Sequence, residues 1–398
     1  MLRFRRNMKH RRKGLLMDDL FIDEQIPYSE GAVIKVVGVG GAGGNAIANM
    51  VRENIGKVEY IAVNTDAQAL KASGANTSIL ISKLGLGAGG RPEKGKEYAL
   101  ESIDEIRNSI KGADMVFITC GMGGGTGTGA APVIAAEAKA SGALTVAVVS
   151  TPHTTAGSRR INIAKEGLAE LINYVDSYII VPNDGMQDAG HKLTHKEALR
   201  MADDVLRQSI QGICEIASNG GHINIDFADV RTAMGQQGKA VMGIGTATGE
   251  ARAKQAFENA LKSPLLSDTS IKGAYAVLVN ISGHEDDLLN DEVTEIQALV
   301  YEHAGNDALI IDGIGYDDRT DGSISVTIVA TGINNGKNVD NLTKVGDIKK
   351  AKPTGAIVTN MQEKLKKISK EDHNLQGISN RLNEDYFEIP TYLRKQSD

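Results

Sequence analysis

The chain has 398 residues, of which 41% are hydrophobic and 24% are charged, with a formal net charge of −6 at pH 7. This composition is typical of a globular protein large enough for two domains, and the negative charge argues against a nucleic-acid-binding protein. Two cysteines exclude a disulfide framework and suit a reducing compartment, and no apolar run approaches the roughly 20 residues that a membrane-spanning helix needs.

Residues 1–31 are set apart by their charge. Seven lysine or arginine residues fall between Arg3 and Lys13, and only a short apolar stretch follows them. A secretory signal needs a longer apolar segment, so we expect a basic, disordered extension. The sequence from Met17 also resembles the start of a translated protein, so the extension would come from an upstream start codon. A weak attraction to anionic lipid or nucleic acid is the alternative.

Short apolar runs alternate with helix-like segments from residue 32 to about residue 182. The runs are rich in valine and isoleucine and lie at residues 32–39, 58–64, 114–120, 143–150 and 177–183. Apolar runs without polar alternation are typical of parallel strands buried on both faces, and the helices between them predict βαβ units. We therefore expect an α/β domain over residues 32–195 with a doubly wound parallel sheet.

A long amphipathic helix is predicted over residues 195–218. Its apolar residues recur at spacings of three and four, at Leu199, Ala202, Val205, Leu206, Ile210, Ile213 and Ile216. At roughly 1.5 Å per residue the helix spans about 30 Å. It is apolar enough to be buried between two domains, and we assign residues 196–218 to this central helix.

A smaller α+β domain is predicted over residues 219–333. Helix-like segments at residues 250–262 and 291–304 alternate with strand-like runs at 274–282, 308–314 and 323–333. Beyond it the composition turns polar and lysine-rich, so we expect residues 334–384 to form a flexible linker. Aromatic and apolar residues then return, and we interpret residues 385–398 as a docking peptide.

Three glycine-rich segments precede predicted helices. The first contains Gly38, Gly40, Gly41, Gly43 and Gly44, the second spans residues 120–132, and the third, residues 85–92, precedes a predicted helix at 93–110. Glycine lets backbone N–H groups converge, and a helix N-terminus adds positive potential, so the segments predict a polyphosphate site at the carboxyl ends of the strands. The hydroxyl groups of Thr126 and Thr128 can donate hydrogen bonds to phosphate or help hold a magnesium ion.

The first glycine segment alone leaves a different kind of nucleotide enzyme open. It is similar to a dinucleotide fingerprint, and Asp66 follows the next strand about where a ribose-binding acid belongs, so an NAD-linked oxidoreductase is one interpretation. A second, richer glycine segment does not belong to that pattern, and the sequence contains no P-loop motif.

Acidic residues cluster just after the long helix. Asp226 and Asp229 are three residues apart, and Asn224 precedes them. Capping of a helix by Asp226 would explain one acid, whereas the spacing puts both carboxylates on one side, able to polarise a water or hold a cation. They would lie a helix length, about 30 Å, from the glycine segments, so one chain would not bring both to one phosphate. Two chains stacked head to tail would, and such a contact makes a filament when it does not close.

A series of short motifs follows in order along the chain. They are GVGGAGGNA, AVNTDAQAL, LGAGGRPEKG, GGGTGTG, VPND, NIDFADVRTAM and SPLL within about residues 32–333, and DYFEIPTYLRKQSD at the end. With them the chain resembles the FtsZ family of bacterial, tubulin-like GTPases of cell division. The resemblance implies a tubulin-like fold, GTP and GDP as ligands with Mg²⁺, head-to-tail filaments, and a cytoplasmic location at the division site on the inner face of the membrane. It also implies that residues 385–398 bind membrane-anchoring division adaptors, with other division regulators as partners and neither nucleic acid nor direct membrane insertion.

The resemblance implies roles for individual residues. Contacts to GTP are implied for Gly40, Gly41, Asn45, Ala88, Gly89, Gly90, Gly124, Gly125, Thr126, Gly127, Thr128, Arg160, Asn183 and Asp203. Of these, residues 88–90 would lie near the γ-phosphate, residues 124–128 would surround the α- and β-phosphates, and Asp203 would accept hydrogen bonds from guanine. Asn224, Asp226 and Asp229 would position the attacking water on the GTP of the neighbouring chain.

The chain departs from the family pattern around the ribose and the base. His153 and Thr155 replace two aromatic residues, and Ala156 replaces a glutamate that usually touches the ribose. Leu199 replaces a phenylalanine that usually stacks on guanine. Losing one stacking contact and one charged hydrogen bond would weaken GTP binding by roughly 1–3 kcal/mol. We therefore expect weaker GTP binding with hydrolysis retained, and a related protein that assembles but hydrolyses weakly is the alternative.

Overall fold

The structure is a computed structural model that describes residues 31–53, 58–183, 195–217, 225–263, 265–266, 270–316 and 322–333, without the side chains of residues 195–200 and 202. These residues fall within a single compact unit. Residues 1–30, the linker and the docking peptide lie outside the described residues, so their assignments remain predictions. The predicted domain boundaries remain predictions as well.

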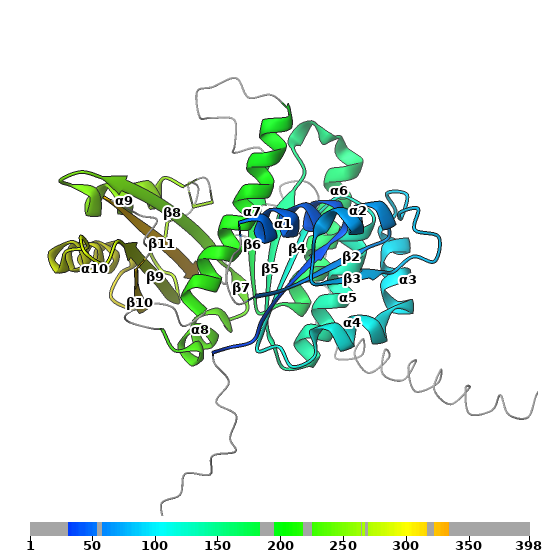
Figure 1. The fold of residues 1–398 in the computed structure, drawn as a ribbon, viewed down its shortest axis with the longest axis horizontal. Coiled ribbons are helices and arrows are strands. Elements are labelled where there is room, and N and C mark those ends of the chain that lie inside the picture. The colour runs from blue at the N-terminus through cyan, green and yellow to red at the C-terminus, as the bar shows by residue number, and fades with distance from the viewer. Residues whose placement is uncertain are drawn as a thin grey trace, which may run out of the picture. The chain divides into compact units, whose positions relative to one another are not determined.

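Seven strands form the first sheet, in the order β3-β2-β1-β4-β5-β6-β7, and every neighbouring pair is parallel (Figure 1). The strands are β1 (Ile34–Val39), β2 (Val58–Asn64), β3 (Thr77–Leu80), β4 (Met115–Gly121), β5 (Leu144–Thr151), β6 (Ser177–Pro182) and β7 (Gly238–Lys239). The predicted doubly wound parallel sheet and its five apolar strands are confirmed. The sequence does not predict β3 and β7, because β3 has only four residues, one of them buried, and β7 has only two residues.

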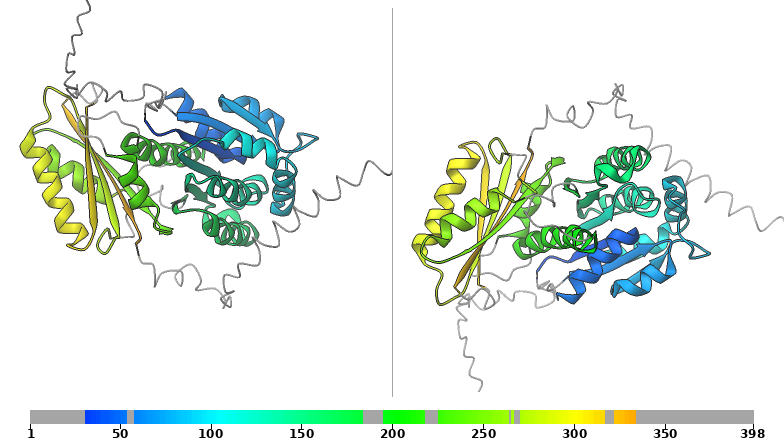
Figure 2. Two further views of the ribbon diagram at one scale, coloured as in Figure 1. Left: turned by 90° about the horizontal axis from the view of Figure 1, so that it is seen from below. Right: turned by 90° about the horizontal axis from the view of Figure 1, so that it is seen from above.

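Helices cover both faces of this sheet (Figure 2). On one face lie α1 (Gly40–Arg52), α2 (Ala67–Ser73) and α7 (His195–Ala217), and on the other lie α3 (Pro92–Glu101), α4 (Ile103–Ile110), α5 (Thr126–Ala140), α6 (Ser158–Leu171) and the short 3-10 helix η2 (Ile172–Tyr174). A second 3-10 helix, η1 (Thr154–Ala156), follows β5 and has no buried residue. The central strands are buried almost throughout, which is why their sequences lack polar alternation. The single helix expected over residues 93–110 is wrong, because the backbone of Ser102 leaves the helical region (φ −101°, ψ 18°) and divides it into α3 and α4.

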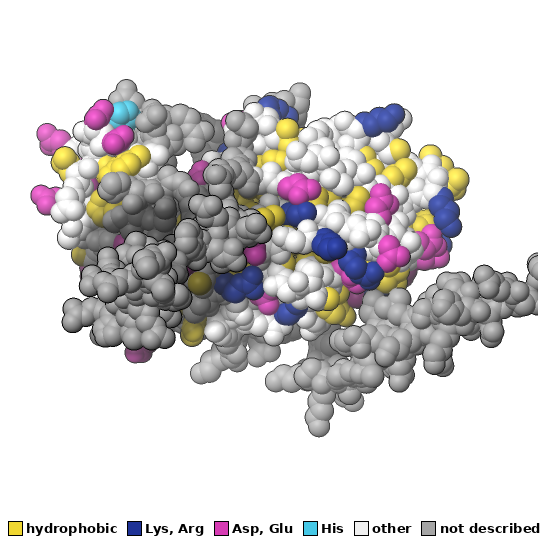
Figure 3. All heavy atoms as spheres, turned by 60° about the horizontal axis from the view of Figure 1, so that its bottom comes forward, with side chains coloured by type: hydrophobic (Ala, Val, Ile, Leu, Met, Phe, Trp, Pro, Cys, Tyr) yellow, Lys and Arg dark blue, Asp and Glu magenta, His cyan; other side chains and the backbone are white. Residues whose placement is uncertain are grey.

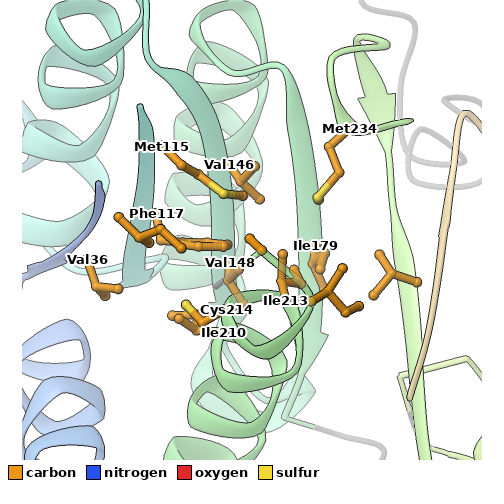
Figure 4. Close-up of a cluster of buried hydrophobic side chains, with 14 of the residues drawn as sticks. Val36, Met115, Phe117, Val146, Val148, Ile179, Ile210, Ile213, Cys214 and Met234 are labelled. Atoms are coloured by element: carbon orange, nitrogen blue, oxygen red, sulfur yellow. The ribbon is translucent and has the colours of Figure 1, made fainter. Parts of the chain in front are cut away.

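The predicted long helix is confirmed as α7, which the structure describes as far as Ala217. Its residues Ile210 and Ile213 are buried and pack with Phe117 and Val148 of the first sheet (Figure 4). The same hydrophobic cluster contains residues of the second sheet, namely Met242, Leu278 and Val329. Burying one aliphatic side chain contributes about 1.5–3 kcal/mol, so the packing of α7 against both sheets is a major source of stability.

The second sheet has four strands in the order β10-β9-β11-β8, with β9 and β10 parallel and β11 antiparallel to its neighbours. Its elements are α8 (Phe227–Met234), β8 (Val241–Thr248), α9 (Arg252–Leu261), β9 (Ala276–Gly283), α10 (Asn290–Ala304), β10 (Leu309–Tyr316) and β11 (Ser323–Thr331). The expected α+β arrangement is confirmed. The sequence does not predict β8, because Gly243 and Gly245 weaken its strand pattern. Both glycines are required, since a Cβ atom on either would lie 2.1 Å from a backbone oxygen of α9.

Basic and acidic side chains are interspersed on the face of the molecule in Figure 3. Ion pairs on the helices of the first sheet include Lys96 with Glu170 at 2.6 Å and Arg107 with Glu137 at 2.8 Å. None of the described helices is both long and apolar enough to cross a bilayer.

Candidate functional site

The three glycine segments meet at the carboxyl edge of the first sheet. As expected, the first segment follows a strand and opens a helix: β1 passes directly into α1, and at the junction Gly40 has a φ of 72°, in the left-handed region that favours glycine. A Cβ atom on Gly40 would lie 3.0 Å from the backbone nitrogen of Gly127, and one on Gly125 would lie 2.9 Å from the Cβ atom of Ala88. The second segment therefore contacts both the first and the third.

The glycines of these segments serve two different purposes. Close packing requires some of them, since a Cβ atom on Gly43 would lie 2.4 Å from a backbone oxygen of β4, and one on Gly129 would lie 2.0 Å from a backbone oxygen of α3. At Gly41, Gly44 and Gly124, a Cβ atom would meet no described neighbour within 4 Å, and φ lies outside the left-handed region. The fold itself does not require glycine at these three positions. Open backbone there fits a ligand that approaches the main chain closely.

Helices α1 and α5 both present an uncapped N-terminus at this edge. Their N-cap residues are Val39 and Gly125, whose side chains have no hydrogen-bonding group. The N–H groups of the first helical turn have no partner within the helix and carry partial positive charge, so the two helix ends together favour a polyphosphate. The predicted phosphate-binding residues Gly40, Gly41 and 126–128 belong to these first turns.

The two threonines of the second segment have different partners. Thr128 is buried, and its hydroxyl accepts a hydrogen bond from the N–H of Gly123 at 2.9 Å, which stabilises the turn before α5. Thr126 is half-buried, and its hydroxyl oxygen lies 2.6 Å from that of Thr65, the residue after β2. The hydroxyl of Thr128 thus shapes the glycine segment, and that of Thr126 lies closer to solvent.

The third segment is attached to the residues that follow β2. The N–H of Gly87 donates to the carbonyl of Thr65 at 2.9 Å, and the N–H of Ala67 donates to the carbonyl of Gly85 at 3.3 Å. Residues 88–90, predicted to lie near the γ-phosphate, follow directly. No role is predicted for Thr65 from the sequence, although its place after a buried strand at the carboxyl edge is a usable signal.

Two polar groups lie on the face of the sheet that α1 and α7 cover. Asp203 of α7 accepts a hydrogen bond from the side chain of Asn45 on α1. Burial raises the pKa of Asp203 to about 6, and the hydrogen bond from Asn45 opposes this shift. Asn183 follows β6, and its buried side-chain oxygen has no hydrogen-bond partner in the described part of the chain. An unpaired buried amide oxygen costs about 1–3 kcal/mol, so a donor group on a bound ligand fits this position.

The residues expected near the ribose, namely His153, Thr155 and Ala156, lie between β5 and α6. Arg160 of α6 packs across the second glycine segment, since its Cγ lies 2.8 Å from where a Cβ atom at position 123 would stand. His153 opens η1, and its Nδ1 accepts a hydrogen bond from the backbone N–H two residues later at 3.1 Å. Ala156 ends η1 and is exposed. The side chain of Leu199 lies outside the described residues.

Asp226 and Asp229 lie at the opposite, amino edge of the first sheet. Asp226 caps α8 by accepting a hydrogen bond from the N–H two residues later at 3.1 Å, which confirms the capping role considered from the sequence. Both residues are exposed. Arg231 of the same helix donates to the backbone oxygens of Asp114 and Gly142, just before β4 and β5, at 3.1 and 3.2 Å. Arg231, for which the sequence predicts no role, therefore attaches the acidic helix α8 to this edge.

The acids and the glycine segments thus occupy opposite edges of one sheet. The seven residues of β4 separate these edges by about 23 Å, at roughly 3.3 Å per residue. The Asp226 and Asp229 carboxylates of one chain are therefore too far from its own glycine segments to contact the same phosphate. Asn224 lies outside the described residues.

Asp66, on which the NAD interpretation depends, has a structural role. Its Oδ1 caps α2 by accepting hydrogen bonds from the N–H groups of Gln68 at 2.8 Å and Ala69 at 3.2 Å. Within the described ranges no cluster of three or more histidine, cysteine or acidic side chains could hold a metal. Magnesium often binds through substrate phosphates, waters and one or two protein oxygens, so a bound nucleotide needs no such cluster.

Family models match most of the described chain. Residues 33–191 match the GTPase domain of the tubulin/FtsZ family, and residues 238–334 match the C-terminal domain of the FtsZ family. The cell division protein FtsZ of Wigglesworthia glossinidia brevipalpis is 43% identical over 383 residues, which cover 94% of this chain and 100% of that protein. The FtsZ of Azotobacter vinelandii is 40% identical over 394 residues, which cover 94% of this chain and 99% of that protein.

Solved structures show the same relationship. An FtsZ dimer from M. jannaschii has a TM-score of 0.72 and 44% identity, covering 76% of this chain and 88% of that chain. CetZ2 from Haloferax volcanii, with a TM-score of 0.65 and 21% identity over 78% of this chain and 96% of that chain, shares the fold. These matches leave no support for the NAD-linked alternative, and the chain belongs to the tubulin/FtsZ family.

Proposed function

We propose that this chain is a GTPase of cell division that polymerises head to tail, in the cytoplasm at the division site on the inner face of the membrane. GTP binds at the glycine segments of one chain and is hydrolysed with the acidic residues of the next chain. Bound GTP strengthens the contact between chains, and hydrolysis weakens it. The GTPase-domain match and the FtsZ relatives support this function.

One observation carries the proposal. The polyphosphate-binding features lie at the carboxyl edge of the first sheet, and the exposed acids Asp226 and Asp229 lie at its amino edge, about 23 Å away along β4. A second chain stacked with its amino edge on this carboxyl edge completes the site. Repeating the same contact along one axis produces a filament.

GTP binding uses backbone and side-chain groups together. The phosphates lie against the first turns of α1 and α5, where open backbone at Gly41 and Gly124 leaves room for them. The carboxylate of Asp203 accepts hydrogen bonds from the N1–H and N2–H groups of guanine, a pair of donors that adenine lacks. The side-chain oxygen of Asn183, which has no partner among the described residues, receives a hydrogen bond from the nucleotide, and Arg160 brings positive charge to the second segment.

Hydrolysis needs an oriented water at the γ-phosphate. Magnesium, when bound, neutralises charge on the β- and γ-phosphates. Asp226 and Asp229 of the adjoining chain, together with Asn224, orient the water for in-line attack, and a carboxylate accepts its proton. Both carboxylates are exposed and so accessible to a neighbouring chain.

The C-terminal residues provide the link to other division proteins. Residues 385–398 carry aromatic and apolar side chains after a polar, lysine-rich stretch. A peptide of this kind docks on a partner through a few apolar anchors, and its partners are membrane-anchoring adaptors and other division regulators. Binding of the isolated peptide to such an adaptor, compared with a peptide in which Tyr386 and Phe387 are replaced by serine, tests this role.

The dependence of GTP turnover on chain concentration tests the main proposal. Turnover per chain should be close to zero in dilute solution and rise steeply above a threshold concentration, because the complete site forms only between chains. Equal turnover per chain at low and high concentration would contradict the shared site.

A further inference from the structure

A pair of threonine hydroxyls lies where the glycine segments join. Thr65 Oγ1 and Thr126 Oγ1 are 2.6 Å apart, the length of a strong O–H···O hydrogen bond. Thr126 is the first residue of α5. A Cβ atom on Gly40 would lie 3.4 Å from the Cβ atom of Thr126, and Ala88 packs against the adjacent Gly125. Thr126 therefore lies where all three glycine segments meet, and Thr65 contacts it.

Burial decides which hydroxyl donates the proton. The Thr65 side chain is fully buried, with 0% of its surface exposed, whereas Thr126 is half-buried. A buried hydroxyl proton without an acceptor costs the free energy of a lost hydrogen bond, and Thr126 Oγ1 is the acceptor that the described structure offers to Thr65. Thr65 therefore donates and Thr126 accepts. The Thr126 proton must then point away from Thr65, toward the open side of the helix terminus.

The main chain of Thr65 is held as firmly as its side chain. Its N–H donates to the side-chain oxygen of Asn64 at 2.8 Å, and its carbonyl accepts the N–H of Gly87 at 2.9 Å. Three hydrogen bonds thus connect this one buried residue to β2, to α5 and to the third glycine segment. A residue fixed in this way can direct the Thr126 hydroxyl with little loss of side-chain entropy on ligand binding.

We propose that Thr65 is a positioning residue that directs the Thr126 hydroxyl proton at a phosphate oxygen of the bound nucleotide. Its carbonyl at the same time fixes the third segment through Gly87. Because Thr65 is buried, it acts on the nucleotide only through these two neighbours. The inference rests on the proposed function, since it requires phosphate at the second glycine segment.

A double-mutant cycle tests this assignment. GTP affinity is measured with a fluorescent GTP analogue and dilute chain for Thr65→Val, Thr126→Val and the double variant. Loss of the Thr126 donor should weaken binding about tenfold, and loss of its orientation in Thr65→Val about fivefold. The double variant should be weakened about tenfold, and not the roughly fiftyfold that independent effects would give, because Thr65 then has no hydroxyl to orient.

Two further variants separate orientation from structural damage. Thr65→Ser keeps the hydroxyl and should retain GTP affinity within about twofold. Thr145→Val removes another fully buried hydroxyl, one that donates to Ala143 O at 3.1 Å at the amino edge of the sheet, and should leave GTP affinity unchanged. If Thr65→Val does not fold, Thr65→Ala takes its place in the cycle.

Each result of these affinity measurements either supports or overturns the role assigned to Thr65. Multiplicative weakening in the double variant, unchanged affinity in Thr65→Val, or a loss in Thr65→Ser as large as that in Thr65→Val would each overturn the assignment. An unmodified chain that binds no GTP would instead contradict the proposed function itself. Coupled effects of Thr65→Val and Thr126→Val, with Thr65→Ser and Thr145→Val close to the unmodified chain, would support it.

Discussion

Asp226 has two roles that substitution can separate. In α8 its carboxylate caps the helix, with Oδ1 3.1 Å from the backbone nitrogen two residues later. In the proposed filament the same carboxylate orients a water on the GTP of the neighbouring chain. Asparagine caps a helix about as well as aspartate, whereas alanine does not. Asp226→Asn therefore removes the charge and keeps the cap, and Asp226→Ala removes both.

The two variants should differ in stability and agree in rate. Losing the cap costs about 1 kcal/mol in the free energy of unfolding, so Asp226→Ala should be less stable than Asp226→Asn by about this amount. Both should slow GTP turnover by roughly 10²–10⁴, because both lose the water-positioning carboxylate. The GTP affinity of dilute chain should not change, since α8 and the glycine segments lie at opposite edges of the sheet.

The assay combines chemical unfolding followed by circular dichroism with phosphate release above the assembly threshold. Asp286→Asn is the matched control, because this side chain follows β9 of the second sheet and is 91% exposed. It should change neither the free energy of unfolding nor the rate of GTP turnover. Asp226→Asn chains that assemble and hydrolyse GTP at the unmodified rate would refute the catalytic role. Equal stability of the alanine and asparagine variants would refute the capping argument.

Three further predictions concern the nucleotide site. Gly124→Leu puts a side chain into the open space beside the backbone and should lower GTP affinity at least about tenfold without loss of stability. Gly129→Ala places a Cβ atom 2.0 Å from a backbone oxygen and should destabilise the fold by about 1–3 kcal/mol. Similar stability of the two variants in chemical unfolding would contradict the different roles assigned to these glycines. The pKa of Asp203, raised from its usual 3.8 to about 6, means that this residue's contribution to stability is fully present below about pH 4 and is lost as the pH rises through about 6, and Asp203→Asn should remove this dependence. GTP binding has the opposite sign because it needs the carboxylate, so affinity should fall as the pH drops below about 6, and a flat profile between about pH 5 and 8 would count against the guanine contact. Ala156→Glu restores a charged hydrogen-bond acceptor for the ribose and should strengthen GTP binding about fivefold in a titration, and no gain would show that the altered wall does not weaken binding.

Much of the fold follows from hydrophobic periodicity. The runs that become β1, β4 and β5 are buried on both faces, and α7 carries one apolar stripe, so each has a distinct pattern in the sequence. Strand β8 has no such pattern, because Gly243 and Gly245 are needed where α9 approaches its backbone. That requirement arises from a contact between two elements, and local sequence does not report it.

The candidate site, like the fold, is predicted only in part by the sequence. The sequence predicts which segments bind phosphate, but Gly124 and Gly129 are indistinguishable within one glycine-rich motif. Only the fold shows that Gly129 packs against α3 and that Gly124 faces open space. Thr65 is also missed, because its contact with Thr126 joins residues 61 positions apart in the chain. Asp226, by contrast, is predictable as a helix cap from its position before α8.

Mixing two defective chains tests the central claim most directly. Asp226→Asn keeps the nucleotide site and lacks the acid, whereas Gly124→Leu keeps the acid and binds GTP poorly. At a GTP concentration that only the Asp226→Asn chain binds, each variant alone should be nearly inactive, and an equal mixture should regain turnover. Recovery is expected because the acidic helix of the Gly124→Leu chain reaches the GTP held by its neighbour. A mixture no more active than the two variants measured separately would contradict a site built from two chains.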